Sequence, residues 1–169
     1  MNLKNIKLLA LDVDGTLTNG CIYLSENGDE MKAFNVKDGL GIKLLHQRGI
    51  IPAIITGRTS RIVERRAKEL SIKEVHQGIS DKDIVLKELA HKYNLSMDEI
   101  AFMGDDLNDL SAIRIAGISF APSDCAAELK PYIDIIVEHK GGDGAVRDAI
   151  IMILKQLPDD GNIDARITN

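Results

Sequence analysis

The chain has 169 residues, of which 44% are hydrophobic, 28% charged and only 4% aromatic, and its formal net charge at pH 7 is −5. That length suits one domain with a sizeable core. The acidic balance argues against general binding to nucleic acid or to an anionic membrane, and no apolar run approaches the roughly 18 residues that a membrane-spanning helix needs.

The amino-terminal residues and the cysteines suggest where the protein works. Residues 1–7 lead at once into an apolar strand and lack the pattern of a signal peptide. Cys21 and Cys125 lie far apart in the sequence, without a CxxC motif. A disulfide between them stays open, but free thiols in a reducing compartment are favoured. We therefore expect a cytoplasmic protein whose partners include neither nucleic acid nor a membrane.

Short apolar runs alternate along the chain with longer segments of helical periodicity. We expect buried strands at residues 7–13, 50–56, 100–103, 117–121 and 133–137. We expect helices at residues 38–48, 60–70, 81–93, 107–116 and 143–157. Such alternation predicts an α/β fold: a Rossmann-like parallel sheet with helices on both faces. Residues 1–157 would form a single domain, and the polar residues 158–169 a carboxyl-terminal tail.

One stretch interrupts this alternation. Residues 20–24 and 30–36 have the composition of strands, and Glu26-Asn27-Gly28-Asp29 separates them. Asn-Gly between two such runs is a strong hairpin signal. We expect a β-hairpin, inserted at about residues 20–36, that projects from the carboxyl edge of the first strand.

Two acidic groups directly follow apolar strands. The first is Asp12-Val13-Asp14-Gly15-Thr16, and the second is Gly104-Asp105-Asp106-Leu107-Asn108-Asp109. In an open parallel sheet, ligands bind beyond the carboxyl ends of the strands. Carboxylate oxygens from two strand ends suit Mg²⁺, whereas the spacing does not fit an EF-hand Ca²⁺ loop. For Asp105 or Asp106, helix capping is the alternative role.

Two further segments supply groups for binding a phosphate. Thr56-Gly57-Arg58 ends the second core strand with a hydroxyl, a glycine and a guanidinium. Lys82 follows Ser80-Asp81 at the start of a helix, where its ammonium can neutralise a phosphoryl oxygen. Each group alone is unremarkable, but chance agreement of all four in this order is improbable.

That order resembles the haloacid dehalogenase superfamily of phosphotransferases over nearly the whole chain. The resemblance implies that Asp12 is the nucleophile that forms an aspartyl phosphate, and that Asp14 is the general acid and base. It implies that Thr56 and Lys82 complete the catalytic groups by binding phosphoryl oxygens.

The same resemblance implies a Mg²⁺ site. The metal ligands would be the carboxylate of Asp12, the backbone carbonyl of Asp14 and the carboxylate of Asp105. Asp106 and Asp109 would lie just behind them, with Asp109 orienting Lys82 or a metal-bound water. A phosphatase with this constellation needs concentrated positive charge, which a metal and a lysine together supply.

The spacing of the motifs leaves no room for a large cap domain. Only 39 residues separate Thr16 from Thr56, and only 25 separate Thr56 from Lys82. A site without a lid is wet, which is unfavourable for an acyl phosphate. Either a macromolecular substrate covers the site or a neighbouring subunit does. The apolar hairpin favours closed assembly through the hairpins.

Three stretches resemble a narrow, capless branch of the superfamily, the phosphatases of 3-deoxy-D-manno-octulosonate 8-phosphate in lipopolysaccharide biosynthesis. They are Phe34-Asn35-Val36-Lys37-Asp38-Gly39 with Gly41-Ile42-Lys43, Ile54-Ile55-Thr56-Gly57-Arg58, and Gly141-Gly142-Asp143-Gly144-Ala145-Val146-Arg147. The resemblance implies a homotetramer, a small phosphorylated sugar acid as substrate, and a set of residues that bind it. These are Asp14, Asn35, Val36, Lys37, Asp38, Gly39, Lys43, Gly57, Arg58, Arg66 and Lys82.

Several alternatives stay open. On helical spacing Arg61 and Arg65 share a stripe with Arg58 more neatly than Arg66 does, so only the resemblance selects Arg66. A nine-carbon keto-sugar acid 9-phosphate is the alternative substrate, although its phosphatases tend to carry Glu at the position of Arg58. A receiver-like phospho-accepting signalling module and a phosphatase acting on protein or nucleic acid are the alternative functions. The order of the motifs disfavours the receiver.

Overall fold

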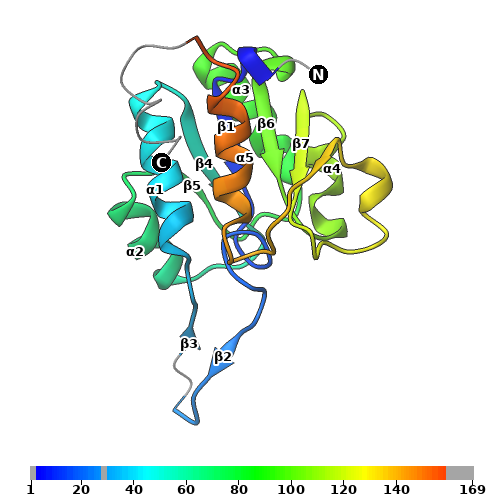
Figure 1. Cartoon of the computed structure of the whole chain (residues 1–169). Helices are drawn as coiled ribbons and strands as arrows, with labels where there is room; N and C mark the ends of the chain where they lie inside the picture. Colours follow the sequence, from blue (N-terminus) through cyan, green and yellow to red (C-terminus); the bar gives the residue numbers. More distant parts are fainter. Residues whose placement is uncertain (1–2, 28–29, 159–169) are drawn as a thin grey trace.

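The protein is described by a computed structural model, which covers residues 3–27 and 30–158 (Figure 1). Its centre is a six-stranded parallel sheet in the order β5-β4-β1-β6-β7-β8. The strands are β1 (Leu8–Leu11), β4 (Ile51–Ile55), β5 (Glu74–His76), β6 (Ile100–Met103), β7 (Ile118–Ala121) and β8 (Ile135–Ile136). Since β1 lies between β4 and β6, the first acidic motif emerges at the middle of the sheet.

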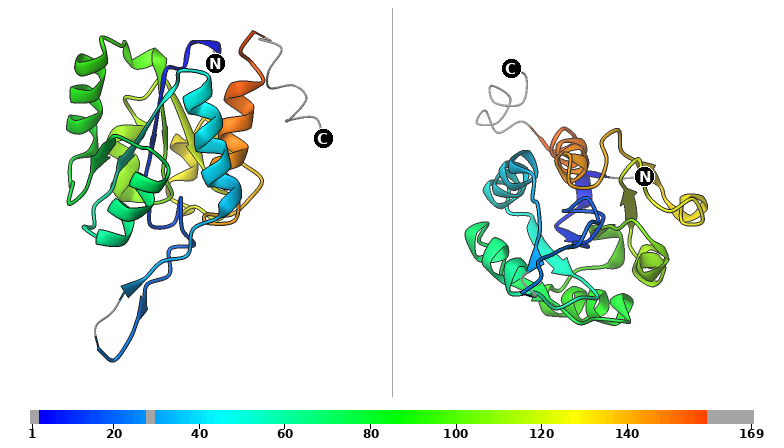
Figure 2. Two further views of the ribbon diagram at one scale, coloured as in Figure 1. Left: turned by 90° about the vertical axis from the view of Figure 1, so that its left-hand side faces the viewer. Right: turned by 90° about the horizontal axis from the view of Figure 1, so that it is seen from below.

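Helices cover both faces of this sheet (Figure 2). They are α1 (Val36–Gln47), α2 (Arg61–Glu69), α3 (Lys82–Tyr93), α4 (Leu110–Ile113) and α5 (Ala145–Leu154). Side chains alternate along β1, so Leu9 and Leu11 pack in the cluster with α1, α2 and α5, whereas Leu8 and Ala10 pack with α3 and α4. The predicted α/β fold with helices on both faces is confirmed.

Some elements are shorter than the sequence pattern suggests. Residues 107–116 form a 3₁₀ turn, η3 (Leu107–Asp109), followed only by the four residues of α4. The Asp106 side chain accepts from the Leu107 N–H at 2.7 Å, which caps the turn. The chain must then reach β7, which begins at Ile118. Other 3₁₀ turns are η1 (Leu3–Asn5), η2 (Met97–Glu99) and η4 (Lys130–Tyr132).

The hairpin projects from the body of the molecule below the carboxyl edge of the sheet (Figure 1). Its paired strands are only β2 (Tyr23–Leu24) and β3 (Glu30–Met31), shorter than predicted. An isolated two-stranded ribbon has no second layer to pack against, which limits its regular pairing. The predicted turn residues Gly28 and Asp29 lie outside the described residues. No cap domain is present among the residues that the structure describes.

The predicted tail also lies outside the described residues, apart from Pro158, whose carbonyl accepts from Arg48 Nη2 at 2.6 Å. No helix in the described part of the chain has the length and apolar character that crossing a bilayer requires.

Candidate active site

The first acidic motif forms a tight loop at the carboxyl end of β1. Asp12 is 3% exposed, and its backbone N–H donates to the carbonyl of Met103 at 2.9 Å, which extends the parallel ladder by one residue. Gly15 has a φ of +93°, and a Cβ there would lie 2.0 Å from Asp105 Oδ2. Only glycine therefore lets this loop lie directly against the second acidic group.

Asp12, Asp105 and Asp109 form a compact acidic cluster, each offering one carboxylate oxygen within 4.8 Å of the others. Burial, together with the charges of Asp12 and Asp109, raises the pKa of Asp105 to about 7. Burial and the charge of Asp12 likewise raise the pKa of Asp109 to about 6, against the opposing effect of Lys82. The groups around the cluster therefore neutralise only part of the negative charge of its carboxylates.

Lys82 supplies a positive charge to this acidic cluster. Its side chain is fully buried, and its Nζ lies 2.8 Å from Asp12 Oδ1 and 2.5 Å from Asp109 Oδ1. Burial alone would lower the pKa of this lysine, but the charges of Asp109 and Asp12 outweigh it and raise the pKa above its ordinary value. Lys82 is thus a protonated, fixed partner of both carboxylates.

The cluster fits a divalent cation. When ionised, the three carboxylates exceed the single ammonium of Lys82 by two negative charges. Asp109 is already engaged, because Oδ1 pairs with Lys82 and Oδ2 accepts the N–H groups of Asp105 at 2.9 Å and Asp106 at 3.3 Å. Asp12 and Asp105 therefore remain as carboxylate ligands, and hard oxygen donors of this kind suit Mg²⁺.

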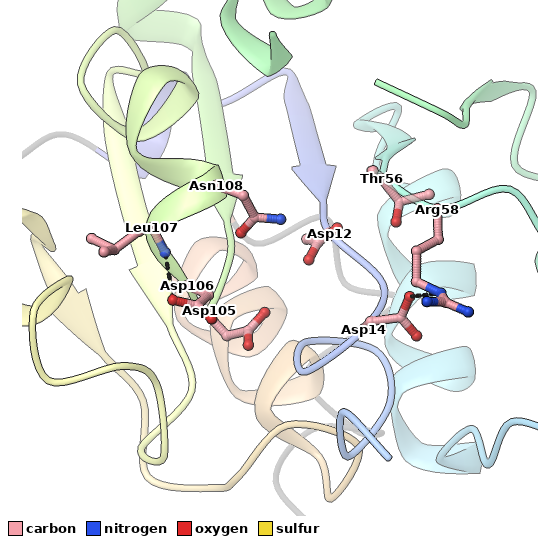
Figure 3. A pocket seen from close by; sticks show the side chains of 9 residues that line it. Asp12, Asp14, Thr56, Arg58, Asp105, Asp106, Leu107 and Asn108 are labelled. Carbon is pink, nitrogen blue, oxygen red and sulfur yellow. Dashed lines mark hydrogen bonds and ion pairs between the residues drawn. The ribbon is translucent and has the colours of Figure 1, made fainter. Parts of the chain in front are cut away.

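A cavity of about 340 Å³ opens directly in front of Asp12 (Figure 3). Residues from three strand ends line it: Asp12, Asp14, Thr56, Gly57, Arg58, Asp105, Asp106, Leu107 and Asn108. Figure 3 shows Asp12 at the centre of the site, with Thr56 on one side and Asp105 and Asn108 on the other. The structure thus brings together the predicted motifs at strands β1, β4 and β6 around a single pocket.

Arg58 borders the pocket beside Asp14. Its side chain is 53% exposed, and its Nε lies 3.8 Å from Asp14 Oδ2. Among the described residues, the guanidinium makes only long ion pairs, with Asp14 and with Glu30 Oε1 at 3.8 Å, and its exposed part can also meet an anionic group that enters the pocket.

Other residues predicted to bind substrate do not line this pocket. Asn35 instead caps α1, accepting from the Lys37 N–H at 2.8 Å, and Arg66 Nη2 donates to the Asn35 carbonyl at 3.4 Å. Gly39 is buried, with a hypothetical Cβ only 2.6 Å from Arg66 Nη2. Val36, Lys37 and Lys43 are exposed on α1. Whether any of these residues contacts substrate stays a prediction.

Asp38, another residue predicted to bind substrate, is buried between two helices. It is 1% exposed, and its Oδ1 accepts the N–H of Arg147 at 2.8 Å in the first turn of α5. Anionic side chains are stabilised at a helix amino terminus, so this carboxylate joins α1 to α5 inside the protein. Asp38 therefore has a structural role in this chain, and its contact with substrate stays a prediction.

Two polar residues beside the acids have roles that the sequence pattern does not predict. Thr16 Oγ1 lies 3.2 Å from Asp105 Oδ1, so the first motif directly orients the second. Lys32 reaches from the hairpin to form an ion pair with Asp14, and its side chain is 1% exposed. The alternation of side chains along a strand could have indicated that Lys32 is buried. Glu30 and Lys32 lie on one face of the strand, and Met31, which is 62% exposed, lies on the opposite face.

Comparison with known proteins identifies relatives of this chain. Residues 72–150 match the model of the haloacid dehalogenase-like hydrolases. The chain is 42% identical over 151 residues to the 3-deoxy-D-manno-octulosonate 8-phosphate phosphatase of Escherichia coli, covering 89% of this chain and 80% of that protein.

Solved structures agree with that relationship. The Moraxella catarrhalis 3-deoxy-D-manno-octulosonate 8-phosphate phosphatase, in complex with magnesium, phosphate and the sugar acid, has a TM-score of 0.93 and 45% identity, covering 99% of this chain and 94% of that one. The cobalt-bound phosphatase of Haemophilus influenzae has a TM-score of 0.93 and 36% identity, covering 99% of both chains.

Proposed function

The chain belongs to the 3-deoxy-D-manno-octulosonate 8-phosphate phosphatases, which are haloacid dehalogenase-like hydrolases, and we propose that it hydrolyses this phosphate ester to the free sugar acid and phosphate in lipopolysaccharide biosynthesis. The observation that carries the proposal is the position of Asp12. Its carboxylate contacts the buried ammonium of Lys82, belongs to the same acidic cluster as Asp105 and lines the pocket.

In the first half-reaction an oxygen of Asp12 attacks phosphorus, and the ester bond to the sugar breaks as the new P–O bond forms. Asp14 gives its proton to the departing sugar oxygen. In the second half-reaction Asp14 accepts a proton from water, which attacks the phosphorus of the aspartyl phosphate and releases phosphate. The Thr56 hydroxyl, at the rim of the pocket, and the charge of Lys82 stabilise the phosphoryl oxygens.

Mg²⁺, held by the carboxylates of Asp12 and Asp105 and by the backbone carbonyl of Asp14, would supply positive charge for the phosphoryl oxygens. Asp109 keeps its place beside Lys82 and the N–H groups of the loop that carries Asp105.

Arg58 is the residue of the pocket that best explains selectivity for a sugar acid. Its guanidinium is partly exposed at the pocket, where a sugar carboxylate can pair with it. A glutamate there, expected for phosphatases of nine-carbon substrates, would repel the same group. The eight-carbon 8-phosphate is therefore the favoured substrate, and a nine-carbon 9-phosphate is the second candidate.

The assembly that completes the site is a homotetramer formed through the hairpins. Ile22, Tyr23, Leu24 and Met31 are 41%, 45%, 71% and 62% exposed. An apolar surface of this kind on a projecting ribbon suits burial against copies of itself. We propose that it also brings Val36, Lys37 and Lys43, which are exposed and do not line this chain's pocket, near the pocket of a neighbour.

Light scattering after size-exclusion chromatography tests the assembly. The variant Leu24→Lys with Met31→Lys should dissociate to smaller species and lose turnover of the sugar-acid phosphate. Ile84→Lys, which alters a 51% exposed residue on α3, is the matched control and should remain a tetramer. A wild-type monomer that is fully active would contradict this assembly.

The proposed location is the cytoplasm. Cys21 and Cys125 are both free thiols, which suits a reducing compartment.

Phosphate-release kinetics test the activity directly. The wild-type protein with Mg²⁺ should prefer 3-deoxy-D-manno-octulosonate 8-phosphate over nine-carbon keto-sugar acid 9-phosphates and p-nitrophenyl phosphate, and excess chelator should stop turnover. Asp12→Asn is the blank and should show none. Release limited to one phosphate per chain, or equal rates with and without chelator, would overturn the proposal.

A further inference from the structure

Lys32 occupies an unusual position for a hairpin lysine. It directly follows β3, yet its side chain is 1% exposed. Lysine is seldom buried unless its ammonium is paired. Here the ammonium contacts Asp14 Oδ1 and lies 3.2 Å from Glu30 Oε1. Among the described residues, this lysine connects the hairpin to the acidic motif of the active site.

The surrounding charges hold Lys32 in this place. Glu30 Oε1 lies 3.8 Å from Arg58 Nη2, and Glu30 Oε2 accepts from Ser60 Oγ at 3.4 Å. Ser60 is itself the N-cap of α2. Glu30 therefore joins Lys32 to the segment that carries Arg58, and the two carboxylates of Asp14 and Glu30 are balanced by two cations.

The two oxygens of Asp14 have different neighbours. Lys32 occupies Oδ1, whereas Oδ2 lies on the side of Arg58, 3.8 Å from its Nε, where both residues line the pocket. Lys32 thus restrains the carboxylate through Oδ1, and Oδ2, at its longer distance from Arg58, is the oxygen that remains to carry a proton. A carboxylate that is free to rotate would spend only part of its time in this orientation.

We propose that Lys32 is a positioning residue for catalysis: it holds Asp14 through Oδ1, so that Oδ2 delivers the proton to the leaving oxygen of the substrate. The inference rests on the proposed function. As the ester P–O bond breaks and the bond from Asp12 to phosphorus forms, the proton on Asp14 Oδ2 passes to the departing sugar oxygen, and Lys32 keeps its own protons.

A purely structural role, in which Lys32 only anchors the hairpin, makes a different prediction. The value of kcat/KM reports all steps up to the first bond cleavage. Loss of proton delivery harms a primary alkyl phosphate, whose alkoxide is a poor leaving group, but scarcely affects p-nitrophenyl phosphate, whose phenolate leaves without a proton. Distortion of the phosphate site would harm both substrates equally.

The test compares these two substrates in wild type, Lys32→Met and Lys32→Arg. In Lys32→Met we expect kcat/KM for the sugar phosphate to fall about 30-fold to 100-fold, and kcat/KM for p-nitrophenyl phosphate to change less than about threefold. Lys32→Arg should recover most of the loss. Lys92→Met is the matched control, because Lys92 also pairs with a carboxylate, Glu74 at 2.7 Å, but lies away from the pocket.

A double variant adds a second readout. In an Asp14→Asn background, Lys32→Met should cause no further loss with the sugar phosphate, because the group that it positions is gone. Equal losses on both substrates, no loss on either, or full additivity with Asp14→Asn would each overturn the inference. Should Lys32→Met fail to fold, Lys32→Gln and Glu30→Gln replace it in the same comparison.

The substrates also separate this inference from the proposed function. If wild type ignores 3-deoxy-D-manno-octulosonate 8-phosphate but hydrolyses another primary sugar phosphate, the proposed substrate is wrong. The Lys32 variants are then compared with wild type on the sugar phosphate that the enzyme accepts and on p-nitrophenyl phosphate. That comparison decides the role of Lys32 independently of the proposed substrate.

Discussion

The Nζ atom of Lys82 lies 2.5 Å from Oδ1 of Asp109, although the lysine begins α3 and the aspartate ends η3. The same ammonium is 2.8 Å from Asp12 Oδ1 at the end of β1. One buried cation therefore links segments that follow three different strands. It holds Asp12, the proposed nucleophile, and the loop of the predicted metal ligand Asp105 in a fixed relation, so we expect stability and activity to depend on the same group.

Replacing Lys82 by Met should reveal both contributions. The variant keeps the length of the side chain but leaves Asp12 and Asp109 without their buried partner. Removing one member of a buried ion pair typically costs roughly 3 to 5 kcal/mol, so the free energy of unfolding should fall by about that amount. Turnover should fall at least about 1,000-fold. Urea unfolding and phosphate release measure the two effects.

A second substitution separates these effects. Adding Asp109→Asn to Lys82→Met removes the uncompensated charge, so the double variant should regain part of the lost stability and none of the turnover. A double variant as unstable as the single one would show that the buried charge of Asp109 is not the cause of the instability.

Gly15→Ala should disable the enzyme through geometry alone. Its φ of +93° disfavours any side chain, and the new methyl group would lie 2.0 Å from Asp105 Oδ2. We expect a loss of about 2 kcal/mol or more in stability and a loss of turnover, measured by urea unfolding and phosphate release. Gly49→Ala is the control, because its φ of +70° is comparable but nothing lies within 4 Å. Similar turnover in the two variants would contradict the argument.

Thr16→Val should weaken Mg²⁺ binding without removing a metal ligand. The variant keeps the shape of Thr16 but loses the hydrogen bond from Oγ1 to Asp105 Oδ1 at 3.2 Å. Outer hydrogen bonds of this kind are worth about 10-fold to 100-fold in metal affinity, so half-maximal activity should need about 10-fold more Mg²⁺. Ser119→Ala removes another buried hydroxyl, 2.9 Å from Asp134 Oδ2, and should leave the requirement unchanged. Equal shifts in the two variants would refute the assignment.

The sequence predicts best those features that depend on local patterns. The apolar strands are short and uninterrupted, so the strand ranges expected from the sequence agree with β1, β4, β6 and β7 to within a few residues at each end. The two acidic motifs follow such strands, and parallel strands end at one edge, so their meeting could be expected. That Asp12, Asp14 and Asp105 line one pocket follows from this geometry.

Other features depend on long-range contacts that a local pattern does not encode. Lys32 and Asp14 belong to segments whose relative position is set by how the hairpin leaves the body. Nothing in the local pattern at Asp38 indicates that its carboxylate accepts from the Arg147 N–H of α5. No local pattern indicates that a Cβ at Gly141 would lie 1.8 Å from the Gly15 carbonyl oxygen. The last loop thus supports the first motif.

Arg58→Glu should change substrate selection rather than chemistry. The substitution replaces a cation at the pocket by a carboxylate beside Asp14, so an anionic sugar should be repelled. We expect KM for the eight-carbon sugar-acid phosphate to rise about 10-fold to 100-fold, with a much smaller change for p-nitrophenyl phosphate. Arg58→Lys keeps the positive charge, so its KM for the eight-carbon sugar-acid phosphate should lie between those of wild type and Arg58→Glu. A proportional loss on both substrates would exclude a role in selection.

Asp38 should make the protein less stable as pH rises. Its pKa is raised from the ordinary value of 3.8 to about 6, chiefly by burial, although the Arg147 N–H and Arg66 oppose this effect. Among the described residues no hydrogen-bond donor reaches its Oδ2. The native state therefore keeps a proton that the unfolded chain releases. This contribution to stability is complete below about pH 4 and is lost as pH rises through about 6, by up to roughly 3 kcal/mol.

Asp38→Asn tests this reasoning, because the neutral amide can still accept from the Arg147 N–H through its oxygen. The free energy of unfolding of the variant, minus that of wild type, should become more positive between pH 4 and pH 7, measured by urea unfolding at several pH values. Asp98→Asn alters an exposed acid of η2 and should give a difference that is flat over this range. A flat difference for Asp38→Asn would mean that the native carboxyl ionises as readily as it does in the unfolded chain. Burial would then not control its protonation, and the link between α1 and α5 would persist unchanged at neutral pH.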